Sequence, residues 1–588
     1  IFMDFKIPYS AQKKLKEKLN FIYGEQKTAE FYPELEDFIL EFAAEHPELR
    51  KQDQGSARLS EKDSVVICYG DHIQTEGEPP LQTLNNFFKN HLDSSISTIH
   101  LLPFFPYSSD DGFAVIDYKQ VNPEFGNWSD IEAISENFSL MFDAVINHIS
   151  SESKWFKKYK KQEGKYANYF IEADPEKDYS MVTRPRAKPL LTEVETAAGK
   201  KHVWTTFSPD QIDLNFKETE VLLEIIDVLL FYAAQGAEII RLDAIAYLWK
   251  EIGTSCIHLL ETHKIIQLFK EIFKLVAPAT LILTETNVPH EENISYFGQG
   301  VDEADMVYNF TLPPLVLYSF LEEDASRLTE WAASLEELEA GNYYFNFLAS
   351  HDGVGLRPVE GILTENQIKD VVKKVKAKGG LVSYKTNSDG SKSPYEINVS
   401  YVDAVRDQDK KIKLQVKQFM ASQAIMLALQ GIPGIYLHSL LGSENYEQGV
   451  EETGAKRRIN REKLDRGRLL NELNKEGSFR KQVFDSYREL LKLRQKNKAF
   501  APASPQKILE LDPNVFAVQR GEAEQKITAL TNVSAEVIEL EIKADLIKAG
   551  NKSALRDIIK KEDYKIENDI LYLKLAPYQN RWLKAREE

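Results

Sequence analysis

The chain has 588 residues, of which 43% are hydrophobic and 28% charged, a composition typical of a folded globular protein with a large core. Its net charge of −18 disfavours non-specific binding to nucleic acid or to anionic membranes, although a local arginine cluster can still bind a small anion. Two cysteines, Cys68 and Cys256, form no CxxC pair. We therefore expect two reduced thiols without a redox or metal role.

Residues 1–60 space their apolar side chains at three and four, as in AQKKLKEKLNFIYG and PELEDFILEFAAEH, which predicts helices. The opening stretch contains no apolar signal core behind a basic segment, and no apolar run reaches membrane-spanning length. We expect a cytoplasmic protein, a monomer or a homodimer. Its N-terminal extension would brace the rest of the chain or form a dimer contact.

Seven short apolar segments follow, separated by stretches with helical periodicity. Apolar runs with little alternation, joined by helices, predict parallel strands that are covered on both faces. Several runs end in a polar or charged residue, which is typical of a (β/α)8 TIM barrel with its site at the carboxyl ends of the strands. The segments are SVVICYG (64–70), STIHLLPF (97–104), LMFDAVINH (140–148), GAEIIRLDA (236–244), TLILTETN (280–287), YFNFLASHD (344–352) and PGIYLHS (433–439).

The predicted organisation is α/β and has three parts. An N-terminal helical extension covers 1–60, and a catalytic barrel covers 61–502, with insertions at about 149–220 and 353–415. Alternating segments such as NVFAVQR and VIELEIK predict an antiparallel C-terminal β-domain over 503–588.

Four segment ends carry candidate catalytic residues. In GAEIIRLDA the strand period of two points Arg241 and Asp243 to one face, and a buried charge is tolerated only when it is paired or belongs to a site. Each end alone also fits an ordinary ion pair or helix cap, so the order of all four is the informative feature. The other three ends are Asn147 and His148 in DAVINH, Glu285 in LTETN, and His351 and Asp352 in ASHD.

In this order the four stretches resemble the signature regions of the α-amylase superfamily, over about 64–500. The resemblance implies Asp243 as nucleophile, Glu285 as acid/base and Asp352 as transition-state stabiliser. Retaining glucosyl transfer uses two carboxyl groups about 5 Å apart, one as the nucleophile and one as a proton donor that later becomes a base. Arg241 would keep Asp243 ionised and oriented.

Finer matches resemble the sucrose-phosphorylase-like subgroup of that superfamily. They lie in PFFPYSSDDGFAVIDY (103–118), VTRPRAKPLL (182–191), FSPDQIDLN (207–215) and KRRIN (456–460). The guanidinium fork suits phosphate because it donates two parallel hydrogen bonds and stays charged. The implied sugar-binding residues are Asp110 with Asp111 beside it, Phe113, His148, Gln211, Arg241, His351 and Arg457, and the implied phosphate- and acceptor-binding residues are Arg184 and Arg186.

The acceptor loop SPYEINVSY places Tyr395 at the aromatic position but carries Glu396 where glutamine is usual. With the N-terminal extension, VVKKVKAKGGLVSYKTN and TRPRA, this resembles the glucosylglycerate phosphorylases of the subgroup. The resemblance implies reversible phosphorolysis of 2-O-α-D-glucosyl-D-glycerate to α-D-glucose 1-phosphate and D-glycerate. Glu396 would repel an anionic acceptor unless it binds a glycerate hydroxyl or pairs with a lysine.

The sequence is also compatible with other activities. Sucrose, sucrose 6'-phosphate or glucosylglycerol could be the donor, or the enzyme could be an α-glucoside hydrolase, because the fold does not choose the acceptor. The non-enzyme alternative is a catalytically inactive barrel that acts as a scaffold for a partner. Asn147 stands where calcium-dependent amylases place a ligand, but calcium needs six to eight oxygen ligands. We expect no metal and no cofactor, phosphate as co-substrate, and small-molecule partners only.

Overall fold

The computed structural model describes residues 5–51, 59–185, 188–386, 391–547 and 554–586. Eight parallel strands close into a barrel in the order β1-β16-β12-β11-β10-β9-β4-β3. The predicted TIM barrel is confirmed. The barrel strands are β1 (Val65–Cys68), β3 (Thr98–Leu101), β4 (Ser139–Ala144), β9 (Ala237–Leu242), β10 (Leu281–Thr284), β11 (Met306–Tyr308), β12 (Tyr343–Phe347) and β16 (Ile432–Tyr436).

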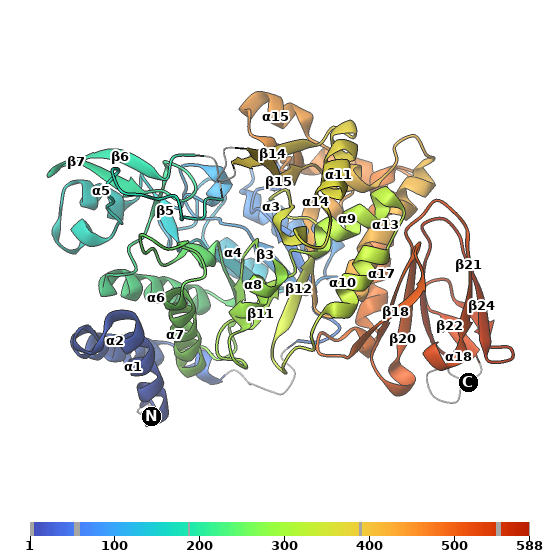
Figure 1. Cartoon of the computed structure of the whole chain (residues 1–588), viewed down its shortest axis with the longest axis horizontal. Helices are drawn as coiled ribbons and strands as arrows, with labels where there is room; N and C mark the ends of the chain where they lie inside the picture. The colour runs from blue at the N-terminus through green and yellow to red at the C-terminus, as the bar shows by residue number, and fades with distance from the viewer. Residues whose placement is uncertain (1–4, 52–58, 186–187, 387–390, 548–553, 587–588) are drawn as a thin grey trace.

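Seven of these strands lie in the seven segments expected from the sequence, and β11 was not expected. It has three residues, all buried, which is too short for a periodic pattern to identify. Helices surround the barrel and cover the outer face of its strands (Figure 1). They are α3 (Pro80–His91), α4 (Trp128–Ser135), α6 (Thr219–Ala234), α7 (Leu260–Val276), α9 (Leu312–Glu322), α10 (Ser326–Ser334), α13 (Ile412–Ala428) and α17 (Phe479–Gln495).

Two inserted regions fold into small antiparallel sheets. In the first, β5 (His148–Ser150) pairs with β8 (Gln211–Asp213), and β6 (Leu191–Thr196) pairs with β7 (Gly199–Trp204). In the second, β15 (Lys392–Asn398) lies between β13 (Val354–Gly355) and β14 (Leu381–Thr386). Figure 1 shows β6, β7, β14 and β15 along the same upper side of the molecule. The smaller elements are β2 (Ile73–Gln74), α5 (Lys154–Lys160), α8 (His290–Ile294), α11 (Glu365–Ala377), α12 (Tyr401–Val405), α14 (Leu437–Leu440), α15 (Glu447–Thr453), β17 (Leu464–Asp465) and α16 (Arg466–Asn474).

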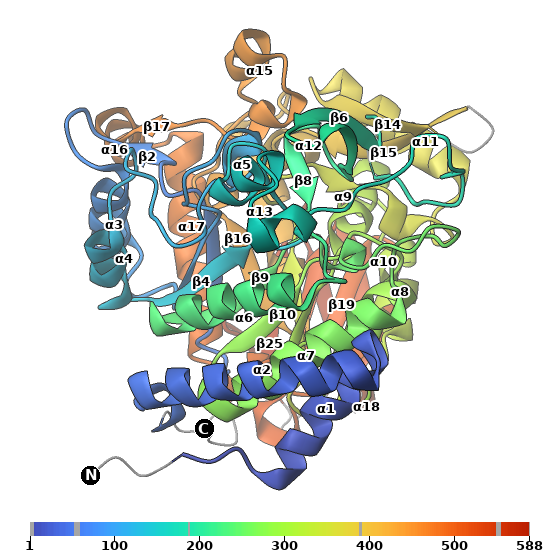
Figure 2. The same ribbon diagram turned by 90° about the vertical axis from the view of Figure 1, so that its left-hand side faces the viewer.

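The N-terminal helices α1 (Tyr9–Tyr23) and α2 (Glu25–Glu45) form a hairpin against the outside of the barrel. The helical spacing buries one face of α1, including Leu15 and Leu19, and α1 packs against α7. Lys14 Nζ lies 3.5 Å from a carboxylate oxygen of Glu271 on that helix. Figures 1 and 2 both place this hairpin at the end of the molecule away from β14 and β15.

Two antiparallel sheets form the C-terminal region, at the right of Figure 1. Arg520, fully buried on β19, donates to the backbone carbonyl of Ala428 on α13 at 3.0 Å and so joins this region to the barrel. Each described helix is too short or too polar to cross a bilayer. The strands are β18 (Gln506–Asp512), β19 (Val515–Arg520), β20 (Ile527–Asn532), β21 (Ile538–Lys543), β22 (Ala554–Asp557), β23 (Glu562–Lys565), β24 (Ile570–Leu575) and β25 (Asn580–Ala585), with the short helix α18 (Ala544–Ile547).

Candidate active site

Three acidic side chains follow three barrel strands at their carboxyl ends. Asp243 follows β9, Glu285 follows β10, and Asp352 lies a few residues beyond β12. All three line one pocket, so the geometry brings together the trio that the sequence singled out. The candidate sugar-binding residues that also line it are Asp110, Phe113, His148, Gln211, His351, Tyr395 and Arg457.

The buried side chain of Arg241 lies close to two of the three acids, Asp243 and Glu285. Arg241 Nη1 lies 2.9 Å from Asp243 Oδ1, and its Nη2 lies 3.9 Å from Glu285 Oε2. Nη1 also pairs with Asp143 on β4, and Asp143 Oδ2 in turn lies 2.8 Å from Nε2 of His100 on β3. Sequence reasoning missed Asp143 and His100, although charged and polar residues inside apolar strands were a signal. Four adjacent strands thus fix the orientation of Arg241.

Burial raises the pKa of both Asp243 and Glu285, and the guanidinium of Arg241 opposes the shift at each. Because Arg241 is 2.9 Å from Asp243 but 3.9 Å from Glu285, it stabilises the anion of Asp243 more strongly. Glu285 Oε2 accepts the backbone N–H of Ala244 at 2.9 Å, which fixes the direction of the carboxyl group. The geometry therefore distinguishes the two acids: Arg241 stabilises the carboxylate form of Asp243 more than that of Glu285.

Asp352 lies in a different electrostatic environment. Although burial opposes it, Arg457, His351 and Arg461 hold the pKa of Asp352 below its usual range. Arg457 Nη1 pairs with Asp352 Oδ1, and Arg461 Nη2 lies 3.5 Å from the same oxygen. The backbone is held as well, since Asn460 Nδ2 donates to the carbonyl of Asp352 at 3.1 Å. Asp352 is thus a fixed carboxylate.

Among the described residues, Glu396 forms its ion pair with Arg457 and with no lysine. Arg457 Nε and Nη2 donate to the two carboxylate oxygens of Glu396 at 3.1 and 2.6 Å. Glu396 is only 3% exposed and packs against the backbone beside Asp352. A Cβ on Gly353 would lie 2.6 Å from Glu396 Cγ, so glycine at this position makes room for the pair. Arg457 therefore bridges two carboxylates.

Phe113 connects several of the candidate sugar-binding residues. Its ring stacks on His351 with centroids 4.7 Å apart, and its carbonyl oxygen accepts a hydrogen bond from Gln211 Nε2 at 2.9 Å. His148 Nε2 lies 2.9 Å from the same carbonyl oxygen. Gln211 Oε1 accepts from Ser208 at 2.8 Å. Protein contacts therefore already orient Gln211 and His148 at the pocket wall.

Asp210 holds the loop that carries Asp110, and sequence reasoning missed it. Its Oδ2 accepts the hydroxyl groups of Ser108 and Ser109 at 2.6 and 2.7 Å. Asp110 and Asp111 both have positive φ, of 52° and 51°, a conformation that costs free energy in non-glycine residues and is common at functional sites. The serine–aspartate bonds stabilise this loop next to the pocket.

Of the two arginines expected at phosphate, the structure describes Arg184. Arg184 is exposed and donates to the backbone carbonyl of Lys188, and it does not line the pocket, whereas Pro185 does. Arg186 lies outside the described residues. Tyr247 and Asn287 also line the pocket, and sequence reasoning did not single them out. Their closeness in the sequence to Asp243 and Glu285 was the available signal.

The side chain of Asn147 contacts a buried lysine, Lys250. Lys250 Nζ donates to Asn147 Oδ1 at 2.7 Å and lies 2.6 Å from Asp213 Oδ2. All three side chains are buried, and Asp213 belongs to β8 of the first inserted region. Lys250 therefore ties that region to the loop after β9. Within the described ranges, no group of three histidine, cysteine or acidic residues is placed to hold a metal ion.

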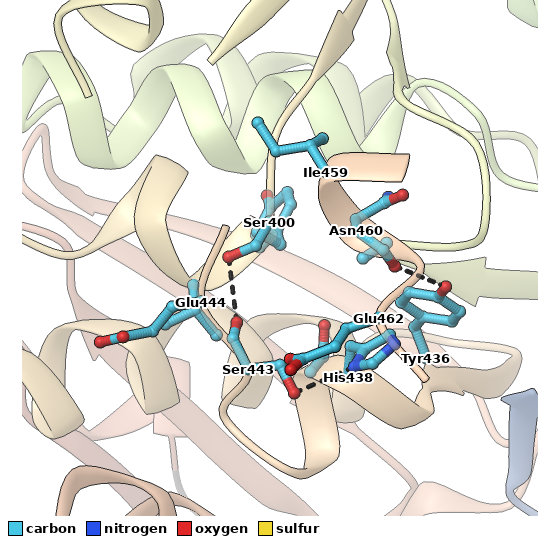
Figure 3. A pocket seen from close by; sticks show the side chains of 12 residues that line it. Ser400, Tyr436, His438, Ser443, Glu444, Ile459, Asn460 and Glu462 are labelled. Atoms are coloured by element: carbon cyan, nitrogen blue, oxygen red, sulfur yellow. Dashed lines mark hydrogen bonds between the residues drawn. The ribbon is translucent and has the colours of Figure 1, made fainter. Parts of the chain in front are cut away.

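A small pocket of about 10 Å³ lies behind the site and is lined by Ser400, Tyr436, His438 and Asn460, among others (Figure 3). It has room for about one water molecule and is too small for a sugar. Tyr436 OH donates to the backbone carbonyl of Asn460 at 2.8 Å. Ser400 Oγ donates to the carbonyl of Ser443 at 3.0 Å. The bond from Tyr436 anchors the segment that carries Arg457 to the end of β16.

A model of the α-amylase catalytic domain matches residues 92–377. The barrel and its three strand-end acids are those of a glycoside-processing enzyme, and the chain belongs to the α-amylase family. Glucosylglycerate phosphorylase of Spirochaeta thermophila is 45% identical over 97% of this chain and 98% of its own length. The enzyme of the same name from Escherichia coli is 45% identical over 89% of this chain and 92% of its own. The crystal structure of sucrose 6F-phosphate phosphorylase from Thermoanaerobacter thermosaccharolyticum matches 89% of this chain and 100% of that one, with a TM-score of 0.71 and 22% identity.

Proposed function

We propose that the protein is a retaining glycoside phosphorylase that interconverts 2-O-α-D-glucosyl-D-glycerate plus phosphate with α-D-glucose 1-phosphate plus D-glycerate. The observation that carries the proposal is the arrangement around Arg241, which stabilises the anion of Asp243 more strongly than that of Glu285 in one pocket and so supports the roles of nucleophile and proton donor. Relatives of that activity, at 45% identity over most of the chain, support the choice of donor and acceptor.

In the first step, a carboxylate oxygen of Asp243 attacks the anomeric carbon while the bond from that carbon to the glycerate oxygen breaks. Glu285 donates its proton to the departing oxygen, so glycerate leaves with a free 2-hydroxyl group. The product on the enzyme is a β-glucosyl ester of Asp243. Asp352, held as an anion, faces the positive charge that develops on the sugar ring.

In the second step, a phosphate oxygen attacks the anomeric carbon and the ester bond to Asp243 breaks. Glu285, now ionised, takes the proton from the attacking phosphate, which restores the starting protonation state. Two inversions give net retention, so the product is α-D-glucose 1-phosphate. We propose that Asp110, His148, Arg241, His351 and Arg457 hold the glucosyl unit in both steps.

Two arginines before β6 remain the candidates for phosphate. Pro185, which stands between them in the sequence, lines the pocket at its edge, and this supports the choice. A guanidinium at this edge would favour phosphate over water as the second-step nucleophile, because its two N–H groups orient the dianion and stay charged. Tyr395 and Glu396 complete the acceptor side of the proposal.

The test is to incubate the protein with α-D-glucose 1-phosphate and D-glycerate and to follow phosphate release and the disaccharide product. D-glycerate should support faster release than fructose, fructose 6-phosphate or glycerol. A preference for one of those acceptors would move the assignment to another phosphorylase, and glucose release that is independent of phosphate and acceptor would indicate a hydrolase. Asp243→Asn should abolish the activity, whereas Lys574→Gln, an exposed position on β24, serves as the matched control.

A further inference from the structure

A second opening adjoins the catalytic pocket, and we call it the mouth. It is a groove of about 660 Å³ that shares Asp110, Pro185, Tyr395 and Arg457 with the pocket, so the two are continuous. The β14–β15 hairpin forms one wall of the mouth, and the segment 453–458 after α15 forms another. Any acceptor that approaches through this groove meets these side chains before it reaches Glu285.

The charge of the mouth has the opposite sign to that of the pocket. Among the described residues, the pocket is lined by the acids Asp110, Asp243, Glu285 and Asp352 and by one cationic side chain, Arg457. The mouth contains more cationic than acidic side chains, in a protein of net charge −18. The cationic residues of the mouth are Lys188, Lys456, Arg457, Arg458 and Arg461, and the acidic ones are Asp110, Asp111 and Glu396.

Arg457 and Arg461 already bind carboxylates of the protein. Arg457 donates hydrogen bonds from Nε and Nη2 to Glu396, and its Nη1 pairs with Asp352. Each of its three nitrogens therefore has an anionic partner. Arg461 is 3% exposed and donates to Asp111 Oδ2 at 2.8 Å and to the backbone carbonyl of His351 at 2.7 Å. Neither arginine offers its charge to a ligand in the mouth.

Two other cations of the mouth, Lys456 and Arg458, are less fully neutralised by carboxylates of the protein. Lys456 Nζ donates to the backbone carbonyl of Val382 at 2.7 Å and makes no ion pair with a described carboxylate. Arg458 is more accessible than Arg461 and shares the single carboxylate of Asp111 with it, at 2.7 Å through Nη2. A negatively charged group in the mouth would therefore find two partly unsatisfied cations, two positions apart in the 3-10 helix Lys456–Asn460.

We propose that Lys456 and Arg458 bind the carboxylate of the acceptor and so select an anionic acceptor over a neutral one. This inference rests on the proposed function. By engaging Arg457, Glu396 prevents that arginine from drawing the carboxylate into the glucosyl pocket. The acceptor is thereby bound by its charged end in the mouth, with its hydroxyl group directed to the pocket.

The experiment uses α-D-glucosyl fluoride as an uncharged donor and compares three acceptors: D-glycerate, glycerol and phosphate. In Lys456→Gln and Arg458→Gln, we expect kcat/KM for glycerate to fall about 10- to 100-fold, the size expected for loss of a charge-assisted hydrogen bond. The values for glycerol and phosphate should fall far less. Lys456→Arg should recover much of the glycerate activity, and Lys574→Gln should behave as the wild type.

Equal losses for glycerate and glycerol would show a merely structural role, and equal losses for glycerate and phosphate would show general attraction of anions; either result overturns the inference. If Arg458→Gln fails to fold, Lys456→Gln carries the test alone, because its side chain binds only a backbone carbonyl among the described contacts. Failure of the wild type to transfer glucose to glycerate would overturn the proposed function and this inference together. Normal wild-type transfer with unselective variants would overturn this inference only.

Discussion

The catalytic pocket and the mouth differ in how their charged residues are held. In the pocket, Arg241, Asp243 and Glu285 lie at the ends of neighbouring barrel strands, and Asp143 fixes Arg241 from a third strand. In the mouth, Lys456 belongs to a segment between helices and contacts a hairpin. In the proposed mechanism, the barrel thus fixes the groups that would act on the anomeric carbon, whereas the inserted segments present the groups that would meet the acceptor.

This difference explains how one scaffold can serve several acceptors. Strand ends cannot move without disturbing the hydrogen-bonded barrel, so the geometry of bond breaking stays constant while loops vary. A change in the pocket should therefore affect every acceptor alike. A change in the mouth should distinguish one acceptor from another.

The largest expected effect is that of Asp243→Asn. An amide is a poor nucleophile for the anomeric carbon, so transfer should fall by about four to six orders of magnitude. The loss should be the same with glycerate, glycerol or phosphate as acceptor, measured by product formation from α-D-glucosyl fluoride. Thermal unfolding of the variant should show a folded protein. A loss confined to one acceptor would contradict the assignment of Asp243 to bond breaking.

Glu285→Gln should have the next largest effect, of about 10²- to 10⁴-fold on glucosylglycerate phosphorolysis. The first step with α-D-glucosyl fluoride should suffer less, because fluoride leaves without a proton donor. Burst kinetics with the two donors measure this contrast. An equal effect on both donors would contradict the role of Glu285 as a proton donor.

The same residue predicts a pH dependence. Activity requires protonated Glu285 in the first step, so the rate should decline as pH rises through the pKa of Glu285. Because burial raises that pKa, the alkaline limb should lie above the ordinary range for a glutamate. A kcat/KM profile for glucosylglycerate would measure it. Its position should not change in Lys456→Gln, since that residue lies in the mouth.

Lys250→Met tests the connection between the pocket and the first inserted region. The substitution removes the cation and leaves Asp213 buried with only neutral partners, which should cost about 3–5 kcal/mol of the free energy of unfolding. Urea unfolding measures this. The exposed Lys574→Met should change it by less than about 0.5 kcal/mol. Equal stabilities of the two variants would show that the Lys250 pair contributes little.

The strand ends could be predicted from the sequence because local patterns encode them. Apolar runs that end in Asp243, Glu285 or Asp352 place these residues at one rim of the barrel, and the chain follows that placement. Asp143 was missed because it lies inside β4, whereas the signal in that segment was taken from Asn147 and His148, which follow the strand.

The mouth could not be predicted in the same way. Glu396 and its partner Arg457 are 61 residues apart in the chain, and no periodic pattern connects an inserted hairpin to a later turn. For this reason the sequence left two alternatives open for Glu396, a glycerate hydroxyl or a lysine, and did not identify Arg457 as its partner. The sequence does contain the residue types, in SPYE and KRRIN, but their pairing is decided by how the two segments pack over Gly353.

Glu396→Gln should have the smallest effect on activity. Glu396 lies at the boundary between the catalytic pocket and the mouth. Gln can accept from Arg457 but cannot neutralise it, so Arg457 should hold Asp352 less firmly and kcat should fall about tenfold for glycerate and glycerol alike. The freed charge should also attract the acceptor carboxylate in an unproductive position, which lowers the KM for glycerate but not for glycerol. Steady-state kinetics with both acceptors measure the split, with Glu539→Gln on β21 as the control. A fall in kcat without the difference in KM would mean that Glu396 only positions Arg457 and does not keep the acceptor out of the glucosyl pocket.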